Sequence, residues 1–454
     1  MNPILNTDSY KLSHYLQYPK DIKFVNSYIE SRGGRWNRLI FYGLQAFLIK
    51  YLSQKITAEN ISEACEFSKA HGMPFNKQGW EYILKEHGGA LPVSIESLKE
   101  GAIIGTENVL LQVQNTDEKV PWIVGWIETA LLRSIWYPVA VATQSYFCKQ
   151  TILRFLDETG DVTDAQFALH DFGARGASSF ESASIGGSAH LLNFGGSDTI
   201  AGALFAMKYY GGQMPAISIP ASEHSTMTAW GKDGEINAFK NMCERFGDGV
   251  FACVIDSYDA LNAIDLWAKN FDEIKKRGGR VVLRPDSGNP VMMASACLER
   301  IMSHTGYSIN DKGYKLLPPF VRLIYGDGIT PESLNDILNE LKMRHISASN
   351  INFGMGGALL QHLNRDTLRF AMKASAISKD GINWQDVFKA PNTDMTKRSK
   401  AGVLALIKKD GVYHTIRADE LKNQKNELEP VFKNGEILRK SSFDEIKARI
   451  IEHS

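Results

Sequence analysis

One pattern repeats about seven times between Gln166 and Ala376: a short apolar run, a loop rich in glycine and polar residues, then a stretch with helical spacing. Alternating strands and helices form parallel sheets, and this many units can close into a barrel. The sequence therefore predicts an α/β fold centred on an irregular barrel of about seven parallel strands. The runs that we assign to barrel strands are Phe167–Leu169, Ala216–Ile219, Val250–Ile255, Arg280–Leu283, Val321–Tyr325, Ile351–Phe353 and Leu368–Ala374.

The segments on either side of the repeat predict a second, mainly β domain built from both ends of the chain. Strand patterns occur between residues 91 and 115, and the turns Asp410-Gly411 and Asn434-Gly435 indicate two hairpins near the C-terminus. We divide the chain into an N-terminal arm with helices and β structure (1–160), the barrel (161–385), and a C-terminal segment that returns to the second domain (386–454).

Helical patterns cover residues 41–52, 58–71 and 77–87. The apolar run Trp122–Tyr137 predicts a helix that ends at Pro138, because proline lacks the N–H that continues a helix. Thr143–Leu156 predicts a second, amphipathic helix.

The composition excludes several classes of protein. The chain has 51 Lys and Arg against 51 Asp and Glu, so no overall charge favours a nucleic acid or an anionic membrane as partner. Its five cysteines are scattered and never in CxxC spacing, which indicates neither a disulfide framework nor a zinc site. The N-terminus lacks a signal-peptide pattern and no segment has the apolar length of a membrane span, so we expect a cytoplasmic protein.

The loops that follow the predicted strands contain the residues with catalytic and binding potential. In α/β barrels the active site lies at the carboxyl ends of the strands, so residues in these loops are expected to meet there. The loops in question are Asp171–Arg175, Glu223–Ser225, Asp256–Asp259, Arg284–Gly288, Gly326–Gly328 and Gly354–Gly357.

Together these loops predict a site for a phosphosugar beside an aromatic ring. Phe172 can stack on a flat ring, while arginine side chains can bind phosphate in bidentate fashion. A single phenylalanine or arginine at a strand end is more often core or a surface ion pair, but the recurrence in six loops favours a site. The candidates are the cations Arg175, Arg284, Arg365 and Lys373, the glycines Gly326, Gly356 and Gly357, and the carboxylates Asp256, Asp286 and Asp327, which could hold Mg²⁺.

Two features remain open from the residues alone. His224, between Glu223 and Ser225, is compatible with a general base, a nucleophile or a hydrogen-bonded structural histidine. The basic stretch from Asn392 to Lys400 could bind phosphate or form a solvated surface.

Several long motifs in the chain resemble the nicotinamide phosphoribosyltransferase family, and the resemblance runs over essentially the whole sequence. They are Asp8–Lys11, His170–Gly176, Gly196–Thr199, Pro220–Ser225, Arg284–Pro290 and Ser442–Ile446. The resemblance implies a type II phosphoribosyltransferase fold and a homodimer with shared active sites. It also implies transfer of phosphoribose from phosphoribosyl pyrophosphate to nicotinamide, which yields nicotinamide mononucleotide and pyrophosphate. The family also implies Mg²⁺, and ATP as an optional co-substrate that phosphorylates His224.

The resemblance also assigns roles to individual residues. Phe172 and Tyr10 of the partner subunit would sandwich the pyridine ring, and Asp198 would accept a hydrogen bond from the carboxamide. Arg175, His224, Arg284 and Asp286 would line the pyrophosphate and ribose region, with Asp256 and Asp286 near Mg²⁺. The further substrate-binding residues would be Arg32, Pro285, Gly326, Asp327, Gly356, Gly357, Arg365, Lys373, Lys389, Lys397 and Ser399. Ala252 departs from the family, which often has a serine near the carboxamide.

Three alternatives compete with this interpretation. A nicotinate phosphoribosyltransferase would share the fold, but the carboxylate of Asp198 should repel the carboxylate of nicotinate. A barrel aldolase could use Lys373 as a Schiff base, although it would leave Phe172 and Tyr10 without a role. A nucleotide-binding protein without turnover is the non-enzymatic alternative.

Overall fold

The computed structural model describes residues 2–393 and 398–452. Their contacts divide the chain into two compact units, each assembled from separate stretches of sequence. Unit 1 comprises Met1–Ala140, Lys208–Gly212 and Asn364–Ser454, and unit 2 comprises Val141–Met207 and Gln213–Leu363. These divisions fall at other positions than the predicted boundaries after residues 160 and 385.

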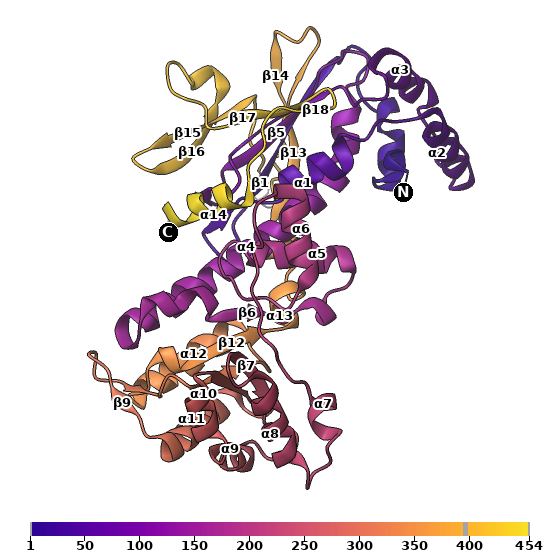
Figure 1. Cartoon of the computed structure of the whole chain (residues 1–454). Coiled ribbons are helices and arrows are strands. Elements are labelled where there is room, and N and C mark those ends of the chain that lie inside the picture. The colour runs from indigo at the N-terminus through magenta and orange to yellow at the C-terminus, as the bar shows by residue number, and fades with distance from the viewer. Residues whose placement is uncertain (1, 394–397, 453–454) are drawn as a thin grey trace. The chain divides into compact units, whose positions relative to one another are not determined.

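Unit 2 is built around a parallel sheet whose strands β6, β7 and β12 are labelled in Figure 1. All adjacent strands pair in parallel. Their order is β6 (Leu169–Asp171), β12 (Ile351–Met355), β11 (Val321–Tyr325), β8 (Arg280–Arg284) and β7 (Val250–Val254).

Two short segments close the parallel sheet into a barrel-like ring without forming full strands. Parallel bridges join Asp171 to Ser197, Gly196 to Ile217, and Ala221 to Ala252 in β7. The ring therefore consists of five strands and two irregular segments, which confirms the predicted α/β fold with an irregular barrel. Gly196–Ser197 is a member of the ring that the strand pattern missed, since it contains no apolar run.

One predicted barrel strand, Leu368–Ala374, was assigned wrongly. It belongs to β13 (Phe370–Ser378), which pairs antiparallel with β1 (Phe24–Ser31) in unit 1. An apolar run does not by itself say which partner strand will bond to it, and here the N-terminal strand is the partner.

The helices of unit 2 begin where the loops after the strands end. Asp259, Asn289 and Thr330 each place a side-chain oxygen on free N–H groups of the first helical turn, which sets the length of the preceding loop. The helices are α5 (Phe180–His190), α6 (Ile200–Tyr210), α7 (His224–Thr228), α8 (Glu235–Phe246), α9 (Ala260–Ala268), α10 (Phe271–Arg277), α11 (Pro290–Thr305), α12 (Pro331–Met343) and α13 (Gly357–Leu360). Unit 2 also contains the short strands β9 (Ser308–Ile309) and β10 (Lys315–Leu316).

The two helices predicted around Pro138 are one continuous helix, α4 (Ile123–Thr159). The expected stop at Pro138 was wrong because a buried helix can lose one N–H bond and continue when its surroundings fit the ring. Gly43 leaves room for the Pro138 ring because it has no side chain; a Cβ atom there would lie only 2.5 Å from that ring.

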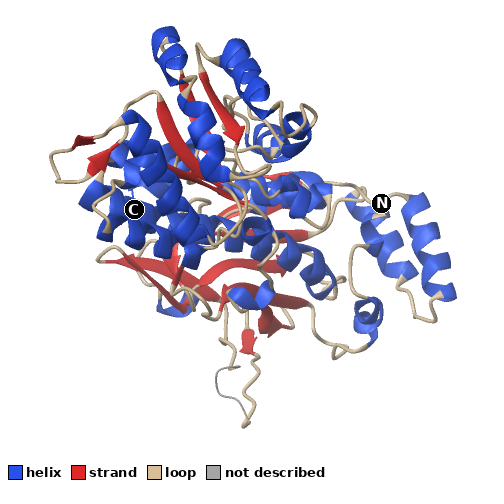
Figure 2. Ribbon diagram, turned by 90° about the horizontal axis from the view of Figure 1, so that it is seen from below, coloured by secondary structure: helices blue, strands red, loops and turns tan. Residues whose placement is uncertain are grey.

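Unit 1 contains a seven-stranded antiparallel sheet, whose long strands are among those drawn in red in Figure 2. Three N-terminal strands lie in its centre and a pair of later strands lies on each side, which confirms the mainly β part predicted from both ends. Its order is β14 (Trp384–Asp386), β13, β1, β5 (Val109–Asn115), β3 (Val93–Ser97), β17 (Glu429–Lys433) and β18 (Glu436–Ile437).

Both predicted hairpins are present in unit 1. β15 (Leu404–Lys409) pairs with β16 (Val412–Arg417), and β17 pairs with β18. The turn residues Asp410, Gly411, Asn434 and Gly435 all have positive φ, as a tight turn with the twist of a hairpin requires.

The remaining elements of unit 1 include the three predicted N-terminal helices. In the described part of the chain, no helix is long and apolar enough to span a membrane. These elements are η1 (Pro3–Leu5), η2 (Ser9–Leu16), β2 (Arg38–Ile40), α1 (Leu44–Phe47) continued by η3 (Leu48–Leu52), α2 (Ala58–Ala70), α3 (Lys77–His87), β4 (Ile103–Gly105), η7 (Arg365–Thr367), η9 (Ala418–Glu420) and α14 (Phe443–Glu452).

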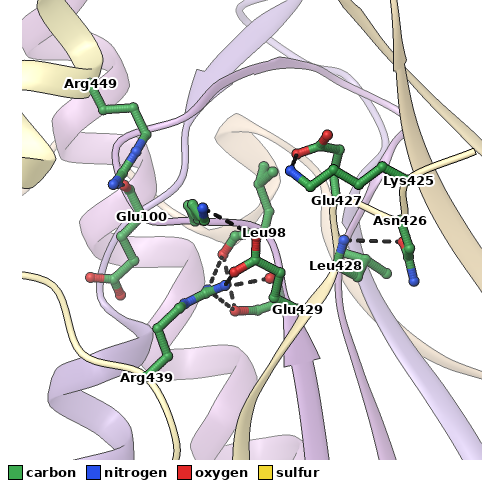
Figure 3. Close-up of polar contacts among 11 residues, drawn as sticks. Leu98, Glu100, Lys425, Asn426, Glu427, Leu428, Glu429, Arg439 and Arg449 are labelled. Atoms are coloured by element: carbon green, nitrogen blue, oxygen red, sulfur yellow. Dashed lines mark hydrogen bonds and ion pairs between the residues drawn. The ribbon is translucent and has the colours of Figure 1, made fainter.

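A buried carboxyl group lies where the C-terminal segment meets the turn after β3 (Figure 3). Arg439 bonds to Glu429 at 2.8 Å and to the carbonyl of Leu98 at 3.2 Å, while Arg449 donates to the carbonyl of Glu100. The Glu100 side chain accepts the N–H of Gln45 at 2.9 Å, but its second oxygen has no hydrogen-bond partner in the described chain. Burial raises the pKa of Glu100 to about 7.

Glu100→Gln should therefore stabilise the protein above pH 7. Ionised Glu100 is disfavoured in the folded state, so stability is expected to fall as the pH rises from the usual pKa of 4.5 through about 7. Because the shift is from 4.5 to about 7 and each unit corresponds to about 1.4 kcal/mol, the variant should gain about 3 kcal/mol at pH 8 and little at pH 4. Urea unfolding at both pH values measures this, with the exposed Glu436→Gln as control; an equal effect at both pH values would contradict the assignment.

Candidate active site

The barrel of unit 2 encloses a cavity of about 270 Å³ that extends along its strands, from Val250 and Arg280 at their amino ends to Phe172 and Arg284 at their carboxyl ends. A cavity of this size fits a single aromatic ring with a small substituent. Its wall includes Phe172, Asp198, Ser218, Ala252, Arg284 and Ile324. The structure thus brings together the predicted ring-binding residues Phe172 and Asp198 and the predicted phosphate-binding residue Arg284.

Phe172 is held in place by the strand ends beside it. Its N–H donates to the carbonyl of Met355 at 3.0 Å, and its ring lies directly over Gly354. A Cβ atom at Gly354 would lie 2.0 Å from the Phe172 ring, so only glycine leaves room for the ring there. The ring also contacts the buried side chains of Val282 and Ile324. Phe172 is therefore a fixed aromatic surface and not a mobile side chain.

Arg284 lies beside the same ring. Its guanidinium carbon is 6.0 Å from the centroid of Phe172, within cation–π range. Its Nε is buried and has no hydrogen-bond partner in the described residues. A buried guanidinium N–H without a partner costs free energy, which an anionic ligand would recover.

Asp198 is positioned by the two irregular segments of the barrel. Its N–H donates to the carbonyl of Asp171 at 3.0 Å, and its carboxylate accepts the hydroxyl of Ser218 at 2.6 Å. Ser218 was not predicted, because it stands inside an apolar run with no motif around it. Ala252, which also lines the cavity, has no hydroxyl, so Ser218 supplies the hydroxyl beside Asp198.

Three carboxylates follow neighbouring strands at this end of the barrel. Asp256 follows β7, Asp286 follows β8 and Asp327 follows β11. The pKa of Asp286 is raised by burial and by the nearby charges of Asp256 and Asp327, with Arg284 and His224 acting in the opposite direction. Ser287, which was also not predicted, donates its hydroxyl to Asp256. The second oxygen of Asp256 is 3.1 Å from Nε2 of His224, whose ring is half exposed.

These carboxylates suit a metal ion that arrives with a phosphate ligand. No group of three or more His, Cys, Asp or Glu residues within 2–393 and 398–452 is arranged to hold a metal ion by itself. Mg²⁺ needs only one or two protein carboxylates when phosphates and waters complete its coordination. Asp286 and Asp256 therefore fit Mg²⁺ bound together with a phosphorylated substrate.

The glycines of the loop after β12 have open space beside their backbone. A Cβ at Gly357 would meet nothing within 4 Å, and one at Gly356 would meet only the carbonyl of Phe172 at 3.9 Å. The turn that carries Arg175 packs against Gly357, since a Cβ atom at Gly176 would lie 3.2 Å from the Cα atom of Gly357. Gly326 packs against Asp286, and Pro285 is buried in the loop after β8.

The remaining predicted cations meet in unit 1. A cavity of about 500 Å³ is lined by Arg32, Arg365, Lys373 and Lys389, together with Glu128 and Arg369, which were not predicted. The pKa of Lys373 is lowered, mainly by burial and also by its three cationic neighbours, although Glu128 opposes this. We name this the cationic cavity. Such a cluster of like charges favours a polyanionic ligand.

Neighbouring residues hold the cations of this cavity in place. Arg32 donates through Nε to the buried Glu30 at 2.9 Å. The buried hydroxyl of Ser399 accepts the N–H of Lys389 at 2.9 Å. Lys397 lies outside the described residues, so the prediction for it stays untested.

Tyr10 lies in unit 1, on the N-terminal arm. It is 56% exposed, although its neighbour Lys11 is buried and bonds to Glu128 at 2.6 Å. The arm is thus anchored while the Tyr10 side chain stays largely exposed.

One unit has a barrel with an aromatic surface, a guanidinium and carboxylates, and the other has a cationic cavity. Together these features define an enzyme that handles phosphorylated sugars. The sequence matches the nicotinate phosphoribosyltransferase (NAPRTase) family over residues 167–436 and the nicotinamide phosphoribosyltransferase N-terminal domain over residues 2–95. The chain belongs to the nicotinate phosphoribosyltransferase family, and it is a phosphoribosyltransferase.

Individual relatives agree with this assignment. The chain is 44% identical to a nicotinamide phosphoribosyltransferase of Xanthomonas campestris, covering 98% of this chain and 97% of that protein. It is 35% identical to a nicotinamide phosphoribosyltransferase of Mycoplasma pneumoniae, over 88% and 94% of the two chains.

Solved structures confirm the fold. A nicotinate-nucleotide pyrophosphorylase from Pyrococcus furiosus has a TM-score of 0.65 at 16% identity, covering 99% of this chain and 95% of that chain. Human nicotinic acid phosphoribosyltransferase has a TM-score of 0.61 at 17% identity, covering 98% and 93%. The type II phosphoribosyltransferase fold implied by the sequence is therefore confirmed, and the aldolase alternative is set aside.

Gly354→Ala should reduce the transferase activity at least roughly tenfold, because its Cβ would push Phe172 away from the cavity. Steady-state kinetics with the purified variant would measure this loss. Gly249→Ala is the matched control, since its Cβ would meet only the carbonyl of Phe246 at 3.9 Å. Full activity in Gly354→Ala would show that the position of the ring does not matter.

Proposed function

We propose that this protein transfers 5-phosphoribose from phosphoribosyl pyrophosphate to nicotinamide, giving nicotinamide mononucleotide and pyrophosphate. The observation that carries the proposal is the pairing of a fixed aromatic surface, Phe172, with the carboxylate of Asp198 in one ring-sized cavity. A carboxylate can accept a hydrogen bond from an amide NH₂ but repels another carboxylate. Two relatives named nicotinamide phosphoribosyltransferase, in Xanthomonas and Mycoplasma, support the same acceptor.

The reaction needs alignment and charge stabilisation more than proton transfer. The pyridine nitrogen of nicotinamide has a free lone pair, so it can attack C1 of the ribose while the bond from C1 to the pyrophosphate oxygen breaks. Phe172 would align the ring, and Arg284 would stabilise the negative charge that builds up on the departing pyrophosphate. Mg²⁺, held by Asp286 and Asp256, would supply further charge neutralisation to that pyrophosphate.

We also propose that the active enzyme is a homodimer. The exposed side of α6 carries Ile200, Leu204 and Met207, which are 74%, 55% and 37% exposed and follow helical spacing. An exposed apolar stripe of this kind favours a protein partner, and a second copy would also give the exposed Tyr10 a ring to stack on. Partner Tyr10 and Phe172 would then lie on either side of the pyridine ring.

Asp198→Ser should raise the nicotinate-to-nicotinamide ratio of kcat/KM roughly tenfold or more, because the change removes the repulsion of the acid and one acceptor for the amide. Product formation with each base and phosphoribosyl pyrophosphate measures the ratio. Asp311→Ser, an exposed aspartate between β9 and β10, is the control. An unchanged ratio in Asp198→Ser would refute the role of Asp198, and a wild-type enzyme that prefers nicotinate would favour the acid as substrate.

ATP is proposed as an optional co-substrate that phosphorylates His224. The contact of Nε2 with Asp256 orients the ring and leaves Nδ1 free as a nucleophile. Attack of Nδ1 on the terminal phosphorus of ATP would release ADP and form a phosphohistidine, whose later hydrolysis to phosphate would favour the overall transfer.

His224→Ala should therefore abolish the acid-labile phosphoprotein formed from ATP and the stimulation of transfer by ATP, while slower ATP-independent transfer remains measurable. Labelling with ATP that carries a radioactive terminal phosphate measures the first effect. His304→Ala is a matched control, because His304 likewise bonds to an aspartate, Asp265, at 2.6 Å. Equal labelling of His224→Ala and the wild type would refute the proposal.

A further inference from the structure

The cationic cavity of unit 1 contains one arginine that no sequence motif indicated. Arg369 lines it beside Arg32, Arg365, Lys373 and Lys389. Within residues 2–393 and 398–452 its guanidinium has no hydrogen-bond or ion-pair partner, whereas the neighbouring Arg365 pairs with Asp366 at 3.4 Å. The structure thus presents Arg369 as an exposed cation in the lining of this cavity, without a partner among the described residues.

The backbone at Arg369 is in an unusual conformation. Its φ is 47°, in the left-handed region that residues with a Cβ atom seldom adopt. The conformation is imposed by the neighbouring strand: the N–H of Arg32 donates to the carbonyl of Arg369 at 3.2 Å, and the hydroxyl of Ser31 donates to that of Leu368 at 2.6 Å. Glycine would satisfy this backbone without strain, so the backbone does not require the arginine side chain.

The charges around the cavity leave room for an anion. Its two lining carboxylates are already paired, Glu128 with Lys11 and Asp366 with Arg365. The cationic side chains that face the cavity therefore repel one another, and binding of a phosphate group would relieve that repulsion. The volume of about 500 Å³ is sufficient for a phosphorylated sugar.

We infer that Arg369 is a further substrate-binding residue, whose guanidinium binds a phosphate group of phosphoribosyl pyrophosphate in the cationic cavity. The inference rests on the proposed function, which supplies this substrate. The planar guanidinium can donate two parallel hydrogen bonds to one phosphate group. Because Arg369 is exposed, its removal should weaken binding by a moderate factor, about five- to tenfold in Kd.

The test is calorimetric titration of phosphoribosyl pyrophosphate with Mg²⁺, without an acceptor base, into the full-length protein. Arg369→Gly removes the cation but suits the positive φ, so the variant should unfold at the wild-type temperature or above while its Kd rises about five- to tenfold. Arg369→Lys, which keeps the charge but loses the bidentate geometry, should lie between the two. The control Arg38→Gln removes an exposed arginine of β2 outside the cavity and should bind as the wild type does.

Each other outcome counts against the inference. Wild-type affinity in Arg369→Gly would show that the side chain does not bind the ligand. An equal loss of affinity in Arg38→Gln would show that the loss comes from the lower net charge of the protein and not from a contact of Arg369. Failure of the wild-type protein itself to bind phosphoribosyl pyrophosphate would overturn the proposed function, and this inference with it.

Discussion

The site in unit 2 depends on the parallel register of the barrel strands. Because β6, β12, β11, β8 and β7 all run in one direction, the loops after them meet at the same end of the ring. Phe172 and the loop that carries Arg284 and Asp286 thus come together although they are far apart in the sequence. The same register places Gly354 under the Phe172 ring, where a side chain would displace it. Position and orientation of the aromatic surface are therefore consequences of backbone pairing.

Each unit holds a different part of the chemistry that phosphoribosyl transfer requires. Unit 2 provides the cavity lined by Phe172 and Arg284 and the carboxylates around Asp286. Unit 1 provides the cationic cavity, where buried Glu30 and the β1–β13 pairing hold Arg32.

The sequence predicted the elements whose signals are local. The barrel loops, both hairpins and the family motifs are examples, since turn residues and helix caps act within a few positions of the chain. It failed where the outcome depends on distant partners: Leu368–Ala374 joined β1, and α4 passed through Pro138 because Gly43 accommodates the ring. Ser218 and Arg369 were missed for the same reason. Ser218 stands inside an apolar run, and only the fold brings it to Asp198 and brings Arg369 to the cationic cavity.

The most direct test of this account is the rate of mononucleotide formation by the wild-type protein with phosphoribosyl pyrophosphate and Mg²⁺, with nicotinamide or nicotinate as the acceptor. The account predicts nicotinamide mononucleotide from the amide and little product from the acid, because the cavity pairs Phe172 with the carboxylate of Asp198. A preference for nicotinate would contradict the assigned role of Asp198. Absence of product from both bases would contradict the proposed reaction itself.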